Sequence, residues 1–575
     1  MRLRRSLRRV WKPLVAVVFA ALVLPGGPAA QTKPRTVDAA KLRQRAHAAF
    51  EAWFQDHPVE ATFAGLHEWD RMPPNFSARA LQARRERASR LLDEAGAEPP
   101  GSWRLEDRIA HAVYRSLLQG ELFELEASVR VRRDASLPLE KTALGIFGLM
   151  IRESPPRQER ARSAFWRLSG LPSSLHSGFR SLSAPEAYAA RRAMAMAVAI
   201  TPLLTEEMAV LVKGITPAQM AELRLSQESA ATSLTLFAAA LRPRIPTMAE
   251  LRPLGRAAYE RLLNGVHLLN LSSAEAAEIA AGELARAKRM EDPAGGRARG
   301  SPGGEGARAS VRKDASEALG SLREFVERKR LLSLPAETPP FEIREMPEVV
   351  ALVAPDGLMA PPGPYEPASP GLYFLPPKKT KSLYLDAALS DERLLLARQA
   401  IPGRHLAASK ANGAADEIRR LARDQVTING WSHYVEEILL DAGLFEGSPA
   451  ARAAAIRLMR SHAARALVEI RIQAEVWTLE QAVSFLAEEE EIPLSEAREE
   501  ALRAATSFGE AMSYTIGKWR IRRMREAFMR SRGAGGELRG FHDAFLSQGM
   551  IPLPLIERVL IGASASSRAA PPSPP

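Results

Sequence analysis

The residues of this chain whose types could do chemistry gather in two short segments. Residues 398–405 are Arg-Gln-Ala-Ile-Pro-Gly-Arg-His, and residues 429–436 are Asn-Gly-Trp-Ser-His-Tyr-Val-Glu. A zinc hydrolase needs imidazole or carboxylate ligands, an open position for water, and a carboxylate that takes the proton of that water. The side chains of the ligand type here are His405, His433 and Glu436. One hypothesis is therefore an active metallohydrolase that uses these three residues.

The other residues of the first segment oppose a metal. Arg398 and Arg404 cannot be deprotonated in a protein and cannot act as ligands, and two guanidinium groups repel a dication. Gln399 has the shape of Glu but lacks a basic carboxylate, so it cannot activate water. We expect such a site to favour an anionic guest or an internal carboxylate partner. The candidate internal partners are Glu436, Glu437 and Glu469.

Several of these residues also have a structural interpretation. His405 is expected to be a hydrogen-bonded histidine packed under a loop. Arg465 and Glu469 have the spacing of an i, i+4 ion pair on one helix. Tyr514 could steady an oxyanion or simply pack. We expect the apolar side chains of the second segment to belong to the core; they are Trp431, Tyr434, Ile438 and Leu439. The isolated histidines His462 and His542 carry little weight.

Helical signals dominate the elements that must position these segments. Ala, Leu, Arg and Glu are abundant, and apolar residues recur at helical spacing. The predicted helices nearest the two segments span 383–405, 414–440, 451–474 and 513–530. Three short apolar runs favour strands, at 341–343, 349–353 and 371–375. We predict a mainly α protein, a large multi-helix assembly around a deep cleft, with a small β element near residues 341–375.

Composition divides the chain further. The predicted parts are a signal peptide (1–30), an N-terminal helical half (40–290), a flexible Gly/Pro-rich loop (291–318), a C-terminal helical half with the candidate site (319–562) and a disordered tail (563–575). The signal has a basic start and a short apolar run, and an uncleaved anchor is the alternative. We expect an exported protein, periplasmic or extracellular, with no stable membrane span after signal cleavage.

Charge and cysteine content exclude several partners. The formal charge is +12, but six cations lie in the predicted signal, which leaves 12 − 6 = +6 for the rest. The remaining cations are interleaved with Glu and Asp on predicted helices, a pattern typical of solvated faces, so we expect no nucleic-acid partner. The chain has no cysteine, which excludes disulfides, thiolate metal sites and attachment of lipid to a cysteine.

Segments outside the candidate site carry a family resemblance. Residues 58–67 are Pro-Val-Glu-Ala-Thr-Phe-Ala-Gly-Leu-His, residues 371–374 are Gly-Leu-Tyr-Phe, and residues 511–518 are Ala-Met-Ser-Tyr-Thr-Ile-Gly-Lys. A closing segment runs from Phe541-His542-Asp543 to Gly549-Met550-Ile551-Pro552-Leu553. In this order they resemble the bacterial family called domain of unknown function 885, whose mostly α-helical members are grouped with zinc-dependent peptidases.

The resemblance implies a damaged metal site. The family carries His-Glu-x-x-Pro-Gly-His-His where this chain has residues 398–405, so its metal-binding His corresponds to Arg398 and its catalytic Glu to Gln399. The first residue of its His-His pair corresponds to Arg404, and the second survives as His405. The Glu that opens the family's Glu-Gly-Trp motif is replaced by Asn429.

A third family segment has changed as well. Its pattern is Arg-Leu-Val-x-Asp-x-Gly-x-His, and this chain keeps the Arg as Arg465 and replaces the Asp by the similar Glu469. The final His corresponds to Gln473. The losses therefore reach three separate segments.

These observations predict an exported and catalytically inactive relative of a zinc-dependent peptidase family. It would need no cofactor or metal, and it would bind peptides or an anionic small ligand in a retained cleft. The expected cleft residues are Arg398, Gln399, Arg404, His405, Asn429, His433, Glu436, Arg465, Glu469, Gln473 and Tyr514. The alternatives are the metallohydrolase described above and a structural or interaction protein of the cell envelope.

Overall fold

The computed structural model describes residues 38–562 except 97, 100, 129, 214, 292–314, 534 and 535. The predicted signal peptide, most of the predicted Gly/Pro-rich loop and the predicted tail lie outside the described residues. Residues 315–318 of that loop are described, and they begin a helix.

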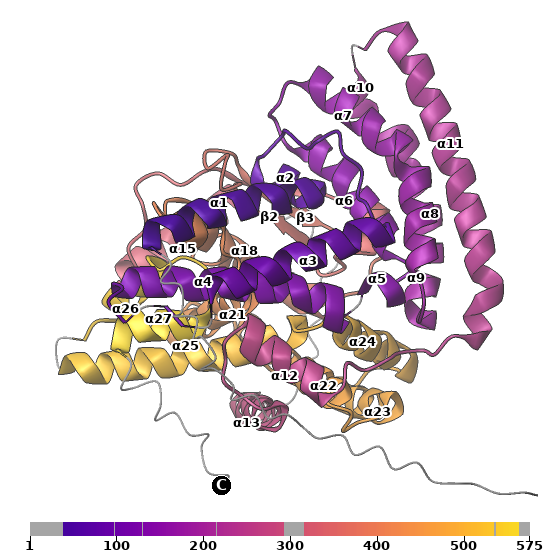
Figure 1. The fold of residues 1–575 in the computed structure, drawn as a ribbon. Coiled ribbons are helices and arrows are strands. Elements are labelled where there is room, and N and C mark those ends of the chain that lie inside the picture. Colours follow the sequence, from indigo (N-terminus) through magenta and orange to yellow (C-terminus); the bar gives the residue numbers. More distant parts are fainter. Residues whose placement is uncertain are drawn as a thin grey trace, which may run out of the picture.

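The chain is mainly α-helical, as predicted (Figure 1). Before residue 292 the helices are α1 (Ala39–Asp56), α2 (Pro58–Ala64), α3 (Ala78–Ala95), α4 (Leu105–Leu122), α5 (Arg130–Arg133), α6 (Leu137–Ile151), α7 (Arg157–Ser169), α8 (Leu171–Ser181), α9 (Ala187–Pro202), α10 (Ala209–Val212), α11 (Pro217–Leu241), α12 (Arg256–Arg261) and α13 (Ser273–Glu291). Four shorter helical turns lie among them: η1 (Phe123–Ser128), η2 (Leu203–Glu207), η3 (Arg242–Thr247) and η4 (Leu262–Val266).

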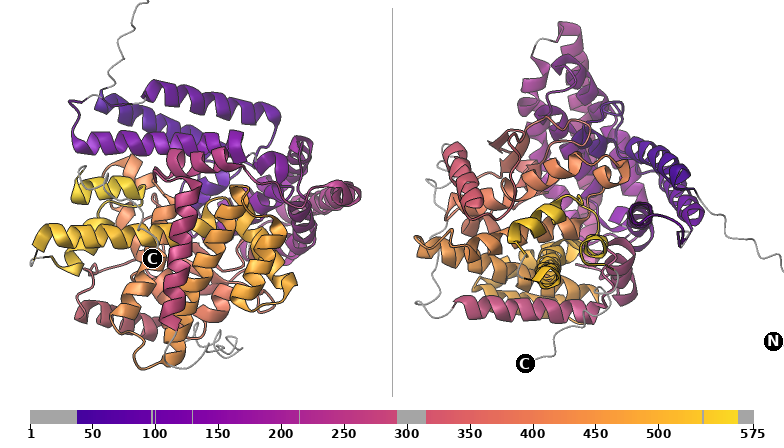
Figure 2. Two further views of the ribbon diagram at one scale, coloured as in Figure 1. Left: turned by 90° about the horizontal axis from the view of Figure 1, so that it is seen from below. Right: turned by 90° about the vertical axis from the view of Figure 1, so that its left-hand side faces the viewer.

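The second part of the chain carries the candidate site. Its helices are α15 (Ala315–Arg328), α16 (Glu348–Ala351), α17 (Leu383–Ala388), α18 (Glu392–Gln399), α19 (Arg404–Asn412), α20 (Glu417–Leu421), α21 (Gln425–Asp441), α22 (Pro449–Gln473), α23 (Leu479–Glu490), α24 (Leu494–Thr506), α25 (Glu510–Arg532), α26 (Leu538–Leu546) and α27 (Leu553–Ile561). Helix α13 lies against α22 and α25 from this part (Figure 2). Helices α7 to α11 project as a block at one side (Figure 1).

The predicted small β element is confirmed as a three-stranded sheet. Its strands are β1 (Phe341–Glu345), β2 (Leu358–Ala360) and β3 (Gly371–Leu375), in the order β1-β3-β2. Strand β3 is the fully buried centre, parallel to β1 and antiparallel to β2. The strand predicted at 349–353 is wrong, because Glu348–Ala351 forms helix α16 behind Pro347 and packs against α6 and α9.

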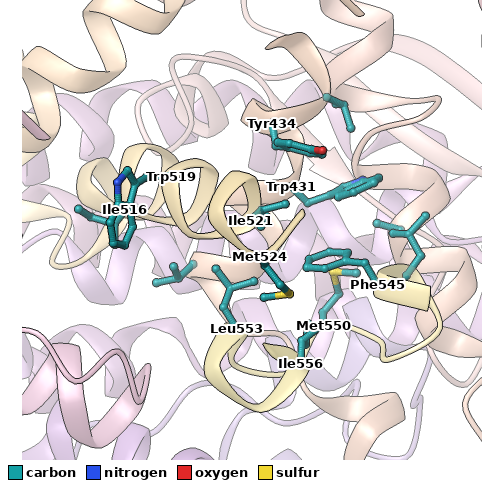
Figure 3. Close-up of a cluster of buried hydrophobic side chains, with 14 of the residues drawn as sticks. Trp431, Tyr434, Ile516, Trp519, Ile521, Met524, Phe545, Met550, Leu553 and Ile556 are labelled. Atoms are coloured by element: carbon teal, nitrogen blue, oxygen red, sulfur yellow. The ribbon is translucent and has the colours of Figure 1, made fainter. Parts of the chain in front are cut away.

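The largest core joins elements from both parts of the chain. Trp431 lies at its centre, fully buried, with its ring stacked on Phe545 at 5.2 Å between centroids (Figure 3). Its Nε1 donates to the carbonyl of Pro402 at 3.0 Å, so the buried indole keeps a hydrogen bond. All four side chains that the sequence assigns to the core are buried, which confirms that prediction. A second core lies between α6 to α11 and the sheet.

Two glycines set how closely α21 and α25 cross. A Cβ atom on Gly430 would lie only 2.5 Å from the Cα of Gly517, so neither position tolerates a side chain without moving a backbone. The close crossing places Asn429 of α21 beside Ser513 of α25. The glycine pair therefore positions two of the segments that carry candidate site residues.

The stretch Ala187–Val212 is long and apolar enough to cross a membrane, by length and composition alone. Here 39% of its most apolar window is buried inside the protein, where α9 packs against α6 and α11. Core helices of soluble proteins have the same length and composition.

Candidate functional site

Arg398 lies at the centre of the candidate site. It is in the last turn of α18 with only 3% of its surface exposed. Its Nη1 donates to Glu436 Oε1 at 3.2 Å and to His462 Nε2 at 2.7 Å. The guanidinium carbon lies 4.3 Å from the ring centroid of Tyr384 and 4.6 Å from that of Tyr514. One carboxylate, one imidazole and two aromatic faces therefore surround this cation.

A tight turn separates Arg398 from the second arginine. The helix predicted over 383–405 is wrong as one element, because α18 ends at Gln399 and α19 starts at Arg404. Pro402 and Gly403 lie in the turn, and a Cβ on Gly403 would lie 1.9 Å from the carbonyl oxygen of Arg398. The turn gives the two arginines different surroundings.

The charges at the centre are balanced internally. Burial alone raises the pKa of the Glu436 carboxyl, but the charge of Arg398 and the hydrogen bond from His433 outweigh burial and hold that pKa below its usual value. Burial lowers the pKa of His433 and, together with Arg398, takes the pKa of His462 well below its usual value. The centre thus holds an Arg–Glu ion pair, and burial disfavours the charged form of both imidazoles.

The two imidazoles complete the packing. His433 Nδ1 hydrogen-bonds to Glu436 Oε2 at 2.8 Å, and its ring meets that of His462 edge-on at 4.7 Å. His462 is stacked on Tyr514 at 4.5 Å. His433 Nε2 is buried and has no hydrogen-bond partner among the described residues.

Arg404 is partly exposed and links α19 to the crossing of α21 and α25. Its Nη2 donates to the hydroxyl of Tyr514 at 2.8 Å and to the side-chain oxygen of Asn429. Asn429 in turn donates to Ser513 Oγ at 2.8 Å. An amide that can both accept and donate suits this position, since it joins an arginine to a hydroxyl.

His405 lies away from the other candidate ligands. Its Nε2 hydrogen-bonds to the carbonyl oxygen of Pro339 at 2.8 Å, which confirms the prediction of a hydrogen-bonded histidine under a loop. A Cβ on Gly371 would lie 2.2 Å from its Nδ1, so the imidazole packs directly on the start of β3. No group of three or more His, Asp or Glu side chains within the described ranges is arranged to hold a metal ion. The structure therefore does not bring His405 together with His433 and Glu436.

The three candidates on α22 face different partners. The predicted ion pair of Arg465 with Glu469 is wrong, because Arg465 pairs with Asp356 at 3.4 Å and with Glu500 at 3.5 Å. Glu469 instead accepts from the backbone N–H groups of Gly509 and Met512, at the start of α25.

A phenol completes the surroundings of Glu469. The hydroxyl of Tyr259 donates to Glu469 at 2.8 Å, and burial raises the pKa of this carboxyl to about 7. Gln473 accepts from the backbone N–H of Leu254 at 2.7 Å and donates to the carbonyl oxygen of Ala505. Glu469 and Gln473 therefore hold neighbouring segments in place.

The sequence patterns gave too little weight to His462 at the centre and did not single out Tyr384. His462 is not isolated, since it contacts Arg398, His433 and Tyr514. Tyr384 covers one face of Arg398 and accepts from Gln399 Nε2 at 3.3 Å. His462 lies in the middle of α22, and only the packing of α22 against other helices shows which residues it contacts. The other discounted histidine, His542, hydrogen-bonds to the hydroxyl of Tyr434 at 2.9 Å.

Behind the centre lies a second buried ion-pair group. Glu437 accepts from Arg286 at 2.7 and 2.9 Å and pairs with Lys518 at 3.1 Å. Lys518 also pairs with Glu283 at 2.9 Å. Of the predicted internal partners of the arginines, Glu436 takes that role, while Glu437 belongs to this second group.

Two cavities lie beside the N-terminal ends of α21 and α25. One has a volume of about 310 Å³ and is lined mainly by charged and polar residues, and the other has about 560 Å³ and is lined mainly by apolar and aromatic ones. They share four lining residues, which are Glu124, Arg130, Gln425 and Phe508. An apolar compartment and a charged compartment are therefore neighbours.

Comparison with known proteins agrees with this architecture. The family model described as bacterial protein of unknown function (DUF885) matches residues 58–560. The chain belongs to this family. A proposed lipoprotein of unknown function from Shewanella oneidensis has a similar structure, with a TM-score of 0.71 at 17% identity, over 91% of this chain and 99% of that one. A proposed lipoprotein from Colwellia psychrerythraea gives 0.71 at 15% identity, with the same coverage. No curated protein matches the chain.

Proposed function

We propose that this DUF885 protein is an exported, non-catalytic relative of zinc-dependent peptidases that binds peptides without cleaving them. The observation that carries the proposal is the buried guanidinium of Arg398, held between Glu436 and His462. A carboxylate and an imidazole are metal-ligand types, and here both are bound to a permanent cation of the chain itself. A zinc ion placed among them would meet that charge at close range.

Gln399 supports the absence of hydrolysis. A peptidase of this kind needs a carboxylate next to the metal-bound water. Gln399 offers an amide, whose Nε2 is engaged with the hydroxyl of Tyr384. The carboxylate at the centre of the site, that of Glu436, is paired with Arg398 and His433 and is not available as a base.

The two neighbouring cavities favour a peptide as ligand. The larger one has aromatic walls from Trp53, Phe54 and Phe76, and the smaller one is lined by charged residues that include Arg133 and Glu186. Ligand pockets combine apolar surface with a few placed polar groups, and a peptide presents side chains of both kinds. Because Glu436 already neutralises Arg398, an anionic ligand beside Arg398 is disfavoured. We therefore place the ligand in these two cavities.

Export rests on the start of the chain and on the relatives. The basic residues before the apolar run 14–24 have the order of a signal sequence. The two structural relatives are described as proposed lipoproteins, which are exported proteins. A location at the cell envelope follows for this chain as part of the proposal.

A peptide-retention assay tests the proposal. The purified chain is dialysed against a tryptic digest of casein, and retained and cleaved peptides are identified by mass spectrometry, with and without a chelator. We expect intact peptides to be retained and no chelator-sensitive cleavage. Chelator-sensitive cleavage, or no retention of any peptide, would contradict the proposal.

Gln425 offers a matched pair of variants for this assay. It lines both cavities, is partly exposed, and forms no side-chain hydrogen bond with another described residue. Gln425→Trp would fill the junction and lower retention, whereas Gln425→Ala would leave it open. Equal retention by both variants would place the peptide elsewhere.

A further inference from the structure

A separate cavity of about 710 Å³ lies between α4, α25, α27 and the loop that follows η4. It shares no lining residue with the two cavities beside α21, and none of the candidate site residues line it. Its volume is in the range of small-molecule sites. The cavity is therefore a distinct feature of the molecule.

Arginine dominates the charge of this cavity. Its walls carry five arginines and two glutamates, which gives 5 − 2 = +3. The arginines are Arg108, Arg115, Arg520, Arg523 and Arg558, and the glutamates are Glu98 and Glu557. A concave surface with one sign of charge concentrates ligands of the opposite sign.

One of these arginines, Arg520, forms an ion pair with a glutamate of the wall. Arg520 donates from two nitrogens to Glu557, at 2.9 and 3.2 Å. Arg115 donates to the carbonyl oxygens of Leu92 and Gly96, which carry no formal charge.

Two arginines at the cavity have unused donors. Arg108 and Arg558 are exposed, and neither side chain has a hydrogen bond or ion pair with any residue that the structure describes. The charges of Arg108 and Arg558 are thus not neutralised by any residue that the structure describes.

The loop that forms one wall is held in a costly conformation. Leu268 and Asn270 both have φ of 55°, in the left-handed region that leucine rarely adopts. The side chain of Asn264 makes two hydrogen bonds of 2.8 Å to the backbone of Leu271, and Arg520 donates to the carbonyl oxygen of Leu269 at 2.8 Å. Several contacts therefore fix a strained wall in one shape, as is common at ligand sites.

We propose that this cavity binds a small organic or inorganic anion with several negative charges, through arginine. The planar guanidinium fork donates two parallel hydrogen bonds to the oxygens of a phosphate or a carboxylate. Arg108 and Arg558 supply the free forks, and Arg115 adds charge from deeper in the wall. The carboxylate of Glu98 repels an anion in the cavity and therefore weakens its binding.

Calorimetric titration of the full chain tests this site, with pyrophosphate and citrate as the two probes. We expect saturable binding of one anion per chain that weakens steeply with added salt. Binding of pyrophosphate alone assigns the site to phosphates, and binding of citrate alone assigns it to carboxylates. Failure of both anions to bind saturably would overturn the proposal, and it would leave peptide retention unaffected.

Charge-matched variants locate the binding. Arg108→Gln with Arg558→Gln should weaken the anion by at least about tenfold, since each removes a charge-assisted donor. Arg79→Gln with Arg224→Gln removes two charges from exposed positions outside the cavity and should change the affinity little. Equal losses in both pairs would overturn the proposal, because they would show only a general effect of net charge.

Glu98→Gln should change the affinity for the anion in the opposite direction. Removing this carboxylate from the wall should tighten the anion by severalfold. An unchanged or weakened affinity would contradict the placement of the anion in this cavity.

Discussion

Arginines in two regions of this protein have opposite roles. Arg398 is enclosed by Glu436, His462 and two tyrosine rings, so its charge is neutralised inside the fold. Arg108 and Arg558 line an open cavity, and neither has an ion-pair partner among the described residues. The number of arginines in a segment therefore says little about ligand binding. What decides is whether a carboxylate within the fold has already neutralised them.

The two regions should also differ in what they contribute to stability. A buried ion pair costs much desolvation, and removal of one partner leaves a buried charge without compensation. An exposed arginine without a partner contributes little to folding. The following predictions test this contrast, from the largest expected effect to the smallest.

Glu436→Gln should produce the largest loss. The substitution leaves the Arg398 guanidinium buried without its carboxylate, and we expect the free energy of unfolding to fall by about 3–5 kcal/mol. Urea denaturation followed by circular dichroism measures it. Glu228→Gln, at an exposed position on α11, is the control and should change stability by less than about 0.5 kcal/mol. A similarly small change in the free energy of unfolding of both variants would show that Glu436 does not compensate the buried charge of Arg398.

The same pair should make the protein sensitive to acid. Arg398 and His433 hold the pKa of Glu436 below its usual value of 4.5 in the folded state. The stability from the pair is therefore fully present above pH 4.5 and is lost as the pH falls through the lowered pKa. The difference in unfolding free energy between the wild type and Glu436→Gln should shrink over that fall, measured by denaturation at a series of pH values. A difference that grows as the pH falls would contradict the assignment.

Tyr514→Phe should have a smaller effect. It removes the hydroxyl that accepts from partly exposed Arg404, but it keeps the ring that covers Arg398. We expect a loss of about 1 kcal/mol, typical of one hydrogen bond. If urea denaturation shows a loss as large as that of Glu436→Gln, Arg404 depends on this contact far more than its exposure suggests.

Arg108→Gln combined with Arg558→Gln should hardly change stability. Both side chains are exposed and without described partners, so we expect a change within about 0.5 kcal/mol by the same denaturation assay. The double variant therefore separates anion binding from folding. A loss of several kcal/mol would mean that these arginines are structural, and the contrast between the two regions would fail.

The sequence was sufficient for most of the fold. Its helical periodicity predicted the long helices α22 and α25 to within a few residues, and the strands at both ends of the β element are confirmed. The helix predicted over 414–440 is wrong as one element, because α20 ends at Leu421 and α21 begins at Gln425, after its N-cap Asp424. The β-branched pair Val349 and Val350 led to the wrong prediction of a strand at 349–353. β-branched residues favour strands in general. Here the two valines belong to a helix that packs against α6 and α9.

The contacts of the site were harder to predict. Spacing along one helix suggested that Arg465 pairs with Glu469, whereas its partners Asp356 and Glu500 come from other segments. His462 likewise contacts Arg398 from a separate helix. Patterns within one element cannot show which element packs against it. The division into two helical halves stays a prediction, although the main core takes side chains from both.

Metal content tests the central claim most directly. The purified chain is incubated with excess zinc, passed through a desalting column, and its zinc is measured by elemental mass spectrometry. If Arg398 serves as the internal cation of Glu436 and His462, the chain should retain far less than one zinc per molecule. One equivalent of tightly held zinc would contradict the account.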